Sequence, residues 1–491
     1  MIKKTDQNEI QNYLKDASNT SGYCNAVYFP ETIEELHSLL ADAADKKTAV
    51  TVCGNRTGLS GAAVPMGGIV ISTEKLNRIL EINKEYKFVI AEPGVLLSDL
   101  LKELKAHKLY YPPDPTELNC FIGGTVATNA SGAKSFKYGA TRNFVLSLDV
   151  CLSTGEIITL NRNEVFADGY KLILQTNTGR IIELTLPEIS MPAVKNAAGF
   201  FCKKNMDAID LFIGSEGTLG IFTRIKLALL EYPEKIFSGV IFFDSEESAL
   251  NFLTEAREKS FASRREMALN KIDATALEYF NKNSLQFLKR DYSRIPENAE
   301  AAVWLEQEYT KENEDAISDL WFKLIEKHNG SLNDSWIAVN EKDRNEIGKF
   351  RHSISAKVNE YIALRNFRKL GTDIAVPHSK LLSFYNHLKN EVEKEKLGYV
   401  VYGHFGDSHI HLNMLPEDEG EFARAKILYK QFCIDAIKVG GTFSAEHGVG
   451  KNKTEYLIEM YGKEAVEKMR EIKRKLDQEM ILGKGKVFDI K

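Results

Sequence analysis

Hydrophobic and polar residues near the start of the chain follow the pattern of a β-α-β unit. Ala26–Phe29 predicts a short strand. Thr32 and Glu35 have the spacing of a capping box, and an amphipathic helix is expected from there to about Lys46. The apolar run Thr48–Cys53 then predicts a buried strand that opens directly into a glycine-rich loop.

Strands and helices continue to alternate through the first half of the chain. Short apolar or alternating runs predict further strands, at Ile69–Ser72, Phe88–Glu92, Val145–Leu152, Glu156–Leu160 and Ile221–Leu229. A helix is expected at Ser98–Ala106. Because Phe121–Arg142 is rich in small residues, it is expected to be loop.

The pattern of residues along the sequence changes near Tyr232. Beyond it the glycine-rich loops thin out, and amphipathic helices alternate with strands, for example at Ser245–Lys259, Ala302–Glu308 and Lys311–Lys327. The C-terminal end returns to glycine-rich loops and closes with a charged helix, Lys463–Glu479. These patterns together predict an α+β protein.

Composition narrows the classes of function. The chain has 43% hydrophobic and 27% charged residues and a net charge of −5, which is typical of a solvated globular protein and disfavours a nucleic-acid partner. Its six cysteines are scattered without a CxxC pair, which favours reduced thiols in a cytoplasmic protein. We find no signal peptide and no apolar stretch of about 20 residues, so no membrane span is expected. Peripheral contact with a membrane stays open.

The glycine-rich loop at Cys53–Gly61 suits a phosphate-bearing ligand. Glycines allow the backbone to approach a ligand closely, and successive N–H groups form a concavity for anions. A tight turn without a ligand is the alternative. The spacing does not match the GxGxxG of dinucleotide-binding folds. Three similar segments follow, at Ile122–Gly132, Phe136–Gly139 and Gly214–Ile221. Four such loops favour one long cofactor that lies across them.

A second group of residues has the chemistry of a metal site. His409, His411 and Asn413 lie on one face of a predicted strand, because side chains alternate along it. His404 joins them if the chain bends between Gly406 and Ser408. Another pair, Glu446 and His447, follows later in the sequence. Imidazole and carboxylate together favour a divalent metal, most simply Zn²⁺, with Mn²⁺ or Fe²⁺ as alternatives.

These segments resemble the vanillyl-alcohol-oxidase or PCMH-type flavoproteins. The matching segments, in order, are CGNRTGLSG, YPPDP, IGGTVATNASG, KYGATRNF and GSEGTLGI. The C-terminal HFGDSHIHLN and SAEHGVG resemble the D-lactate dehydrogenase, glycolate oxidase and D-2-hydroxyglutarate dehydrogenase group. The resemblance spans roughly residues 20–491.

The resemblance implies how the chain is divided. Residues 1–232 are expected to form an FAD-binding PCMH-type domain with two subdomains, and residues 233–440 an α+β substrate cap. Residues 441–491 are expected to return to the flavin and pack on the FAD domain.

The resemblance also implies the residues that bind FAD. They are Gly54, Asn55, Arg56, Thr57, Gly58, Leu59, Ser60, Pro113, Asp114, Gly123, Gly124, Asn129, Ser131, Gly132, Tyr138, Gly139, Glu216, Gly220 and Ile221. Non-covalent FAD is expected, because only Cys53 stands near the family's attachment position. Two departures are Ala62, where the family has glycine, and Gly483–Lys486, where it has Asn-Pro-Gly-Lys.

The same resemblance implies roles in catalysis. His404, His411 and Glu446 are expected to bind the metal. A further set is expected to act on the substrate, with His447 as the general base, Asn413 beside the substrate and Arg351 on its carboxylate. His409 departs from the asparagine of the family motif and is either an extra ligand or a determinant of substrate choice. Members with diacid substrates carry lysine where this chain has Gly371, which disfavours 2-hydroxyglutarate.

The expected reaction is the FAD-dependent, metal-assisted oxidation of a D-2-hydroxy acid, most simply D-lactate or a similar acid, to the 2-oxo acid. A hydride goes to flavin N5, and a histidine takes the hydroxyl proton. Two alternatives stay open: a transferase like alkylglycerone-phosphate synthase, and a non-catalytic flavin subunit of a larger oxidase. The electron acceptor is left open between a quinone, a cytochrome, an electron-transfer flavoprotein and oxygen, and the assembly between monomer and homodimer.

Overall fold

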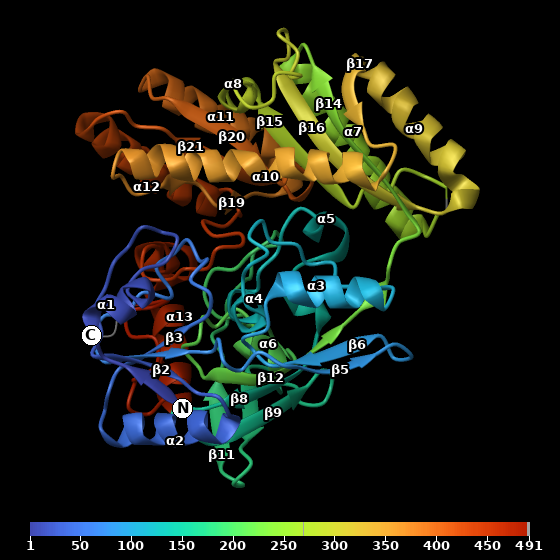
Figure 1. Ribbon diagram of the computed structural model, residues 1–491. Coiled ribbons are helices and arrows are strands. Elements are labelled where there is room, and N and C mark those ends of the chain that lie inside the picture. The colour runs from blue at the N-terminus through green and yellow to red at the C-terminus, as the bar shows by residue number, and fades with distance from the viewer. Residues whose placement is uncertain (269, 489–491) are drawn as a thin grey trace.

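A computed structural model describes residues 1–268 and 270–488. The parts of the expected domains that fall on Leu269 and on 489–491 lie outside these residues. Figure 1 shows a lower part, which holds the N-terminal elements together with the C-terminal helix α13, and an upper part built from the middle of the chain. The domain limits at 232 and 440 stay predictions.

A small, mostly parallel sheet forms one side of the lower part. Its strands, in spatial order, are β1 (Ile2–Lys4), β2 (Ala26–Phe29), β4 (Ile69–Ser72) and β3 (Val50–Cys53). Helix α2 (Ile33–Asp45) joins β2 to β3, and the side chain of Thr32 caps it by accepting from the backbone N–H of Glu35. The predicted β-α-β unit is therefore confirmed. The short helix α1 (Gln7–Ile10) precedes it.

An antiparallel sheet forms the other side of the lower part. Its strands, in spatial order, are β5 (Ile79–Asn83), β6 (Phe88–Ala91), β12 (Ile221–Ala228), β8 (Val145–Cys151) and β9 (Ile157–Asn161). Helix α3 (Leu97–Ala106) buries Leu97, Leu100 and Leu104 against the adjoining core. Two small pairs accompany the sheet, β10 (Lys171–Gln175) with β11 (Ile181–Thr185), and β7 (Leu109–Tyr110) with β13 (Leu230–Glu231). The short helix α6 (Ile209–Phe212) precedes β12.

The prediction that Phe121–Arg142 is loop was wrong for about half of the stretch. This stretch contains α4 (Ile122–Thr128) and α5 (Ser135–Tyr138), and a 3₁₀ turn begins at Thr141. The cause is tertiary packing, because a Cβ on Gly123 would lie 2.6 Å from a carbon of Pro93. Small residues therefore allow this helix to pack closely, although their propensity for helix is low.

The upper part is built on one large sheet. Its strands, in spatial order, are β17 (Gly330–Ile337), β14 (Lys235–Phe243), β16 (Ala301–Tyr309), β15 (Ala276–Asn281), β20 (Tyr399–Gly403), β21 (His409–Met414) and β18 (Leu370–Gly371), and β19 (Ile374–Ala375) also pairs with β21. Side chains alternate between two cores, so Ile241 faces one and Val240 the other.

Helices cover both faces of this sheet. The helices of the first core are α7 (Glu246–Glu266), α9 (Glu314–Lys327), α11 (Leu381–Lys394) and α12 (Glu419–Lys438). The other core holds α8 (Lys282–Leu288) and α10 (Glu341–Leu364). Figure 1 shows α10 running along the side of the upper part that faces the lower one.

The C-terminal segment packs among the N-terminal elements. Helix α13 (Thr454–Leu476) is kinked at Gly462 and contributes Val466 and Met469 to the core beneath the antiparallel sheet. Beyond it, the backbone N–H of Val50 donates to the carbonyl oxygen of Ile481 (2.8 Å). Val50 and Ile481 are separated by most of the sequence and yet belong to one hydrophobic core. None of the helices in the described residues is both long and apolar enough to cross a membrane.

Candidate functional site

A cavity of about 720 Å³ lies between the glycine-rich loops and the large sheet. This volume is in the range typical of cofactor and small-molecule sites. Most of the residues expected to bind the cofactor line it, namely Gly54, Asn55, Arg56, Thr57, Gly58, Leu59, Gly123, Gly124, Ser131, Glu216, Gly220 and Ile221. The rest are not among the lining residues, namely Ser60, Pro113, Asp114, Asn129, Gly132, Tyr138 and Gly139.

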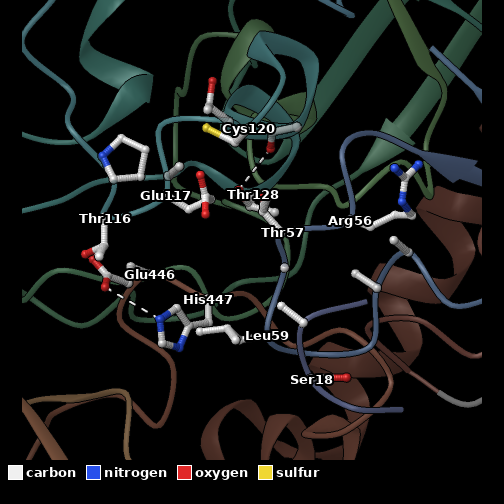
Figure 2. Close-up of a pocket in the computed structure, with 18 of the residues that line it drawn as sticks. Ser18, Arg56, Thr57, Leu59, Thr116, Glu117, Cys120, Thr128, Glu446 and His447 are labelled. Carbon is white, nitrogen blue, oxygen red and sulfur yellow. Dashed lines mark hydrogen bonds and ion pairs between the residues drawn. The ribbon is translucent and has the colours of Figure 1, made fainter. Parts of the chain in front are cut away.

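Glycines leave room for a ligand on the cavity side. A Cβ added to Gly58 or Gly124 would meet no atom within 4 Å. A group that needs close backbone approach therefore fits beside these loops. Arg56 is different, because its guanidinium lies over the ring of Tyr13 at 4.5 Å. Figure 2 shows Arg56 turned away from Glu446 and His447, which lie near Leu59 in this view.

The C-terminal loop is held directly on two of the glycine-rich loops. Gly450 packs so closely on Ser60 that an added Cβ would lie 2.0 Å from the Ser60 carbonyl oxygen. The buried carboxylate of Glu216 accepts the backbone N–H groups of Val449 (2.7 Å) and Gly450 (2.8 Å). Lys486, from the segment that departs from the family motif, is buried, lines the cavity and donates to the Glu216 carbonyl oxygen (3.2 Å).

Three imidazoles converge on one carboxylate oxygen at the other end of the cavity. The Oε1 of Glu446 lies 3.3 Å from Nε2 of His411, 3.4 Å from Nε2 of His404 and 3.6 Å from Nε2 of His447. His411 comes from β21, and His404 reaches the group because a 3₁₀ turn and the left-handed Ser408 (φ 54°) bend the chain between them. The predicted bend is therefore present.

The second nitrogens of two of these rings are held by other groups. The Nδ1–H of His404 donates to Oε1 of Glu278 (2.5 Å), and the Nδ1–H of His411 donates to the carbonyl oxygen of Thr372 (2.9 Å). Both rings thus direct Nε2 toward Glu446. Burial acts to lower the pKa of His404, but Glu278 outweighs it and raises that pKa to about 9.

His447 is neutral and is oriented by a carboxylate. Its Nδ1 lies 3.4 Å from Oδ2 of Asp373, and its backbone N–H donates to the same oxygen (3.0 Å). Burial lowers the pKa of His447 to about 4, although Asp373 and Glu446 oppose the shift. The ring is therefore unprotonated at neutral pH and lines the cavity with an available nitrogen.

Arg351 and Asn413 line the cavity beside this group. Arg351, on α10, is buried and donates through Nε to Oε2 of Glu278 (3.2 Å) and through Nη1 to Oγ1 of Thr116 (3.1 Å). Asn413 is 1% exposed, and its side-chain amide has no hydrogen-bond partner among the described residues. A buried amide without a partner on the cavity wall is a candidate to bind a polar group of a ligand.

Several residues of the site were missed by the sequence analysis. Glu278 links His404 to Arg351, and Lys195 donates to Oε2 of Glu446 (2.9 Å). Asp373 accepts from the ammonium of Lys453 (2.9 Å) and is held ionised, with its pKa far below the usual value in spite of burial, because His447 and Lys453 face it. Glu278 and Lys195 stand singly in ordinary sequence surroundings, so no local pattern marks them. Asp373 lies in a segment, Thr372–Pro377, that matches a strand of the family, but the sequence analysis assigned it no role.

Two family models match the chain. Residues 24–161 match the model described as an FAD binding domain, and residues 232–487 match the model described as FAD linked oxidases, C-terminal domain. The second match alone covers more than half of the chain.

Curated relatives match over nearly their whole length. A D-lactate dehydrogenase of Archaeoglobus fulgidus is 30% identical, with 93% of this chain and 90% of that protein covered. A D-lactate dehydrogenase of Anaerostipes hadrus is 29% identical, with 92% and 87% covered. A D-2-hydroxyglutarate dehydrogenase of Stutzerimonas stutzeri is 27% identical, with 99% and 95% covered.

A solved structure of alkyldihydroxyacetonephosphate synthase superposes with a TM-score of 0.65. It is 14% identical, and the superposition covers 98% of this chain and 81% of that one. At this identity the similarity shows a shared fold.

Proposed function

The chain belongs to the FAD-linked oxidase family, and we propose that it is a dehydrogenase for a D-2-hydroxy acid such as D-lactate. The observation that carries the proposal is the meeting of two features in one cavity. Backbone-lined loops suited to FAD form one side, and Glu446 with its three facing imidazoles forms the other.

The glycine-rich loops would hold FAD. Gly58 and Gly124 provide backbone that a long cofactor can approach, and Lys486 adds a buried cation to the same wall. Bound FAD supplies the acceptor for the hydride from the substrate C2. Loops from both ends of the sequence form this wall, since Gly450 packs on Ser60.

His404, His411 and Glu446 would hold a divalent metal. Their donor atoms are two neutral-imidazole nitrogens and one carboxylate oxygen, a set that suits Zn²⁺ and also Mn²⁺ or Fe²⁺. The ion would supply Lewis acidity at the substrate hydroxyl. His404 carries a proton when no cation is bound, because its pKa is about 9, so metal binding would displace that proton.

His447 is the proposed base. Its neutral ring accepts the hydroxyl proton, and Asp373 fixes the ring and stabilises the imidazolium that results. Arg351 is the proposed partner of the substrate carboxylate, because its buried guanidinium lines the cavity and Glu278 holds it at Nε. The amide of Asn413, which has no partner among the described residues, would orient the substrate.

We expect D-lactate to bleach the flavin absorption band of the purified protein in the absence of oxygen. The same titration with D-2-hydroxyglutarate and glycolate ranks the acids. After treatment with EDTA the band should persist, because the hydroxyl then lacks its Lewis acid. This test needs no knowledge of the electron acceptor, since it follows the reductive half-reaction alone.

Other results of this titration would favour a different function. A flavin band that none of the acids bleaches would favour the transferase or the non-catalytic subunit. Bleaching that survives complete removal of metal would keep the dehydrogenase and reject metal assistance. A folded protein without a flavin band would contradict cofactor binding itself.

Glu278 should support the metal without touching it. We expect Glu278→Gln to weaken Zn²⁺ binding by about 10–100-fold, as is usual when the hydrogen-bond partner of a ligating histidine is changed. Competition with a chromophoric chelator measures the affinity. The matched control is Glu246→Gln, which alters a half-buried carboxylate that accepts from Tyr385 in the upper part of the fold. An unchanged affinity in Glu278→Gln would rule out the supporting role.

A further inference from the structure

His409 is a buried imidazole that the proposed mechanism does not use. It lies on the same face of β21 as His411, is 0% exposed and does not line the cavity. A side chain behind the wall cannot contact a substrate in the cavity, so a direct role in substrate choice is disfavoured. Its surroundings favour a different role.

One ring nitrogen of His409 is already assigned. The Nε2–H donates to Oδ1 of Asp373 (3.1 Å). That carboxylate also receives the ammonium of Lys453 (2.9 Å) and the backbone N–H of Glu446 (3.1 Å), so it acts as an acceptor. Nε2 must therefore carry the proton, and Nδ1 of the neutral ring keeps a lone pair.

The other nitrogen has no partner. Among the described residues, Nδ1 of His409 is a buried polar atom without a hydrogen bond. Buried polar atoms are almost always paired, and an unpaired one calls for a group that the protein atoms alone do not provide. A lone pair on imidazole nitrogen is a ligand for a divalent metal.

The position of the His409 ring is consistent with a role as a metal ligand. One ligand atom from each of His404, His409, His411 and Glu446 lies within 4.8 Å of the others. Two ligands on opposite sides of one zinc ion are at most about 4.2 Å apart, given Zn–N bonds of about 2.1 Å. The four side chains are therefore close enough together to be candidate ligands of one ion.

We propose that Nδ1 of His409 is a fourth protein ligand of the divalent metal. The proposal rests on the metal-assisted function proposed above and extends its ligand set to three nitrogens and one oxygen. Asp373, His409 and the ion would form the carboxylate–histidine–metal arrangement that commonly fixes a ligating ring. A substrate oxygen on the ion would then be added to four protein ligands.

Zinc X-ray absorption of the full-length flavoprotein loaded with Zn²⁺ tests the ligand count. We expect three imidazoles on zinc in the wild type and two in His409→Asn, which carries the residue of the family motif. Chelator competition should show zinc bound at least about tenfold more weakly in this variant. The matched control is His387→Asn, because His387 on α11 pairs with Asp435 outside the site. Flavin content and melting temperature report on folding.

The outcomes separate this proposal from the function on which it rests. Zinc bound tightly in the wild type with two imidazoles would overturn the role of His409 and leave metal assistance intact. A wild type that retains no zinc would overturn metal assistance as well. A wild-type count of two imidazoles would overturn the proposal even if His409→Asn fails to fold.

Discussion

His447→Ala is expected to slow flavin reduction by the hydroxy acid about 10²–10⁴-fold, the usual range for the loss of a general base. The side chain is neutral at neutral pH, lines the cavity and is oriented by Asp373, so its removal leaves the substrate hydroxyl without a proton acceptor. FAD should stay bound, because the glycine-rich loops are untouched. Anaerobic stopped-flow spectroscopy measures the rate.

His387→Ala is the matched control for this prediction. It also removes one imidazole, but from α11, where His387 is bonded to Asp435. The control should reduce its flavin at the wild-type rate. Reduction of His447→Ala at a rate near that of the control would exclude His447 as the base.

Replacing His404 or His411 with alanine should empty the metal site. Each change removes an Nε2 that now faces Glu446, and elemental analysis should find metal near background after dialysis. Flavin reduction should then slow by about 10³-fold, because a Lewis acid contributes several kcal/mol and about 1.4 kcal/mol corresponds to a factor of ten.

The two histidine variants are expected to differ in folding stability. His404→Ala leaves the buried Glu278 with Arg351 as its remaining ionic partner, so stability falls most in this variant. His411→Gln removes the imidazole but retains a polar group of similar length. Full metal occupancy in both His404→Ala and His411→Ala would reject the ligand assignment.

Local elements of the fold were predictable from the sequence. The capping residue Thr32 and the strand Ala26–Phe29 are where the pattern indicates, because capping and alternation depend on neighbours in the chain. The α4 helix was missed, because its formation depends on Gly123 fitting against Pro93 from a distant loop. Propensity alone favours loop there.

Part of the site was also predictable, because strand alternation and turns depend on neighbours in the chain. The two-residue period of a strand places His409 and His411 on one face, and the turn residues after His404 indicate a bend. The positions of Glu278 and Lys195 were not predictable, since each reaches the site from a separate element. Nor does the sequence indicate whether His404 and His447 are protonated. Burial lowers the pKa of each ring and nearby carboxylates raise it, and the balance raises the pKa of His404 but lowers that of His447.

The kinds of groups available follow from the amino-acid sequence alone: glycines for backbone approach, imidazoles and a carboxylate for a metal, and a guanidinium for an anion. These follow from residue identity and from spacing along one strand or loop. Only the tertiary structure decided which groups meet, because Glu446 and His404 lie on different segments, and Gly450 packs on Ser60 across most of the chain. It also decided which atoms remain without partners. Within residues 1–268 and 270–488, Nδ1 of His409 and the amide of Asn413 have no hydrogen-bond partner, because each side chain is buried among neighbours from several segments.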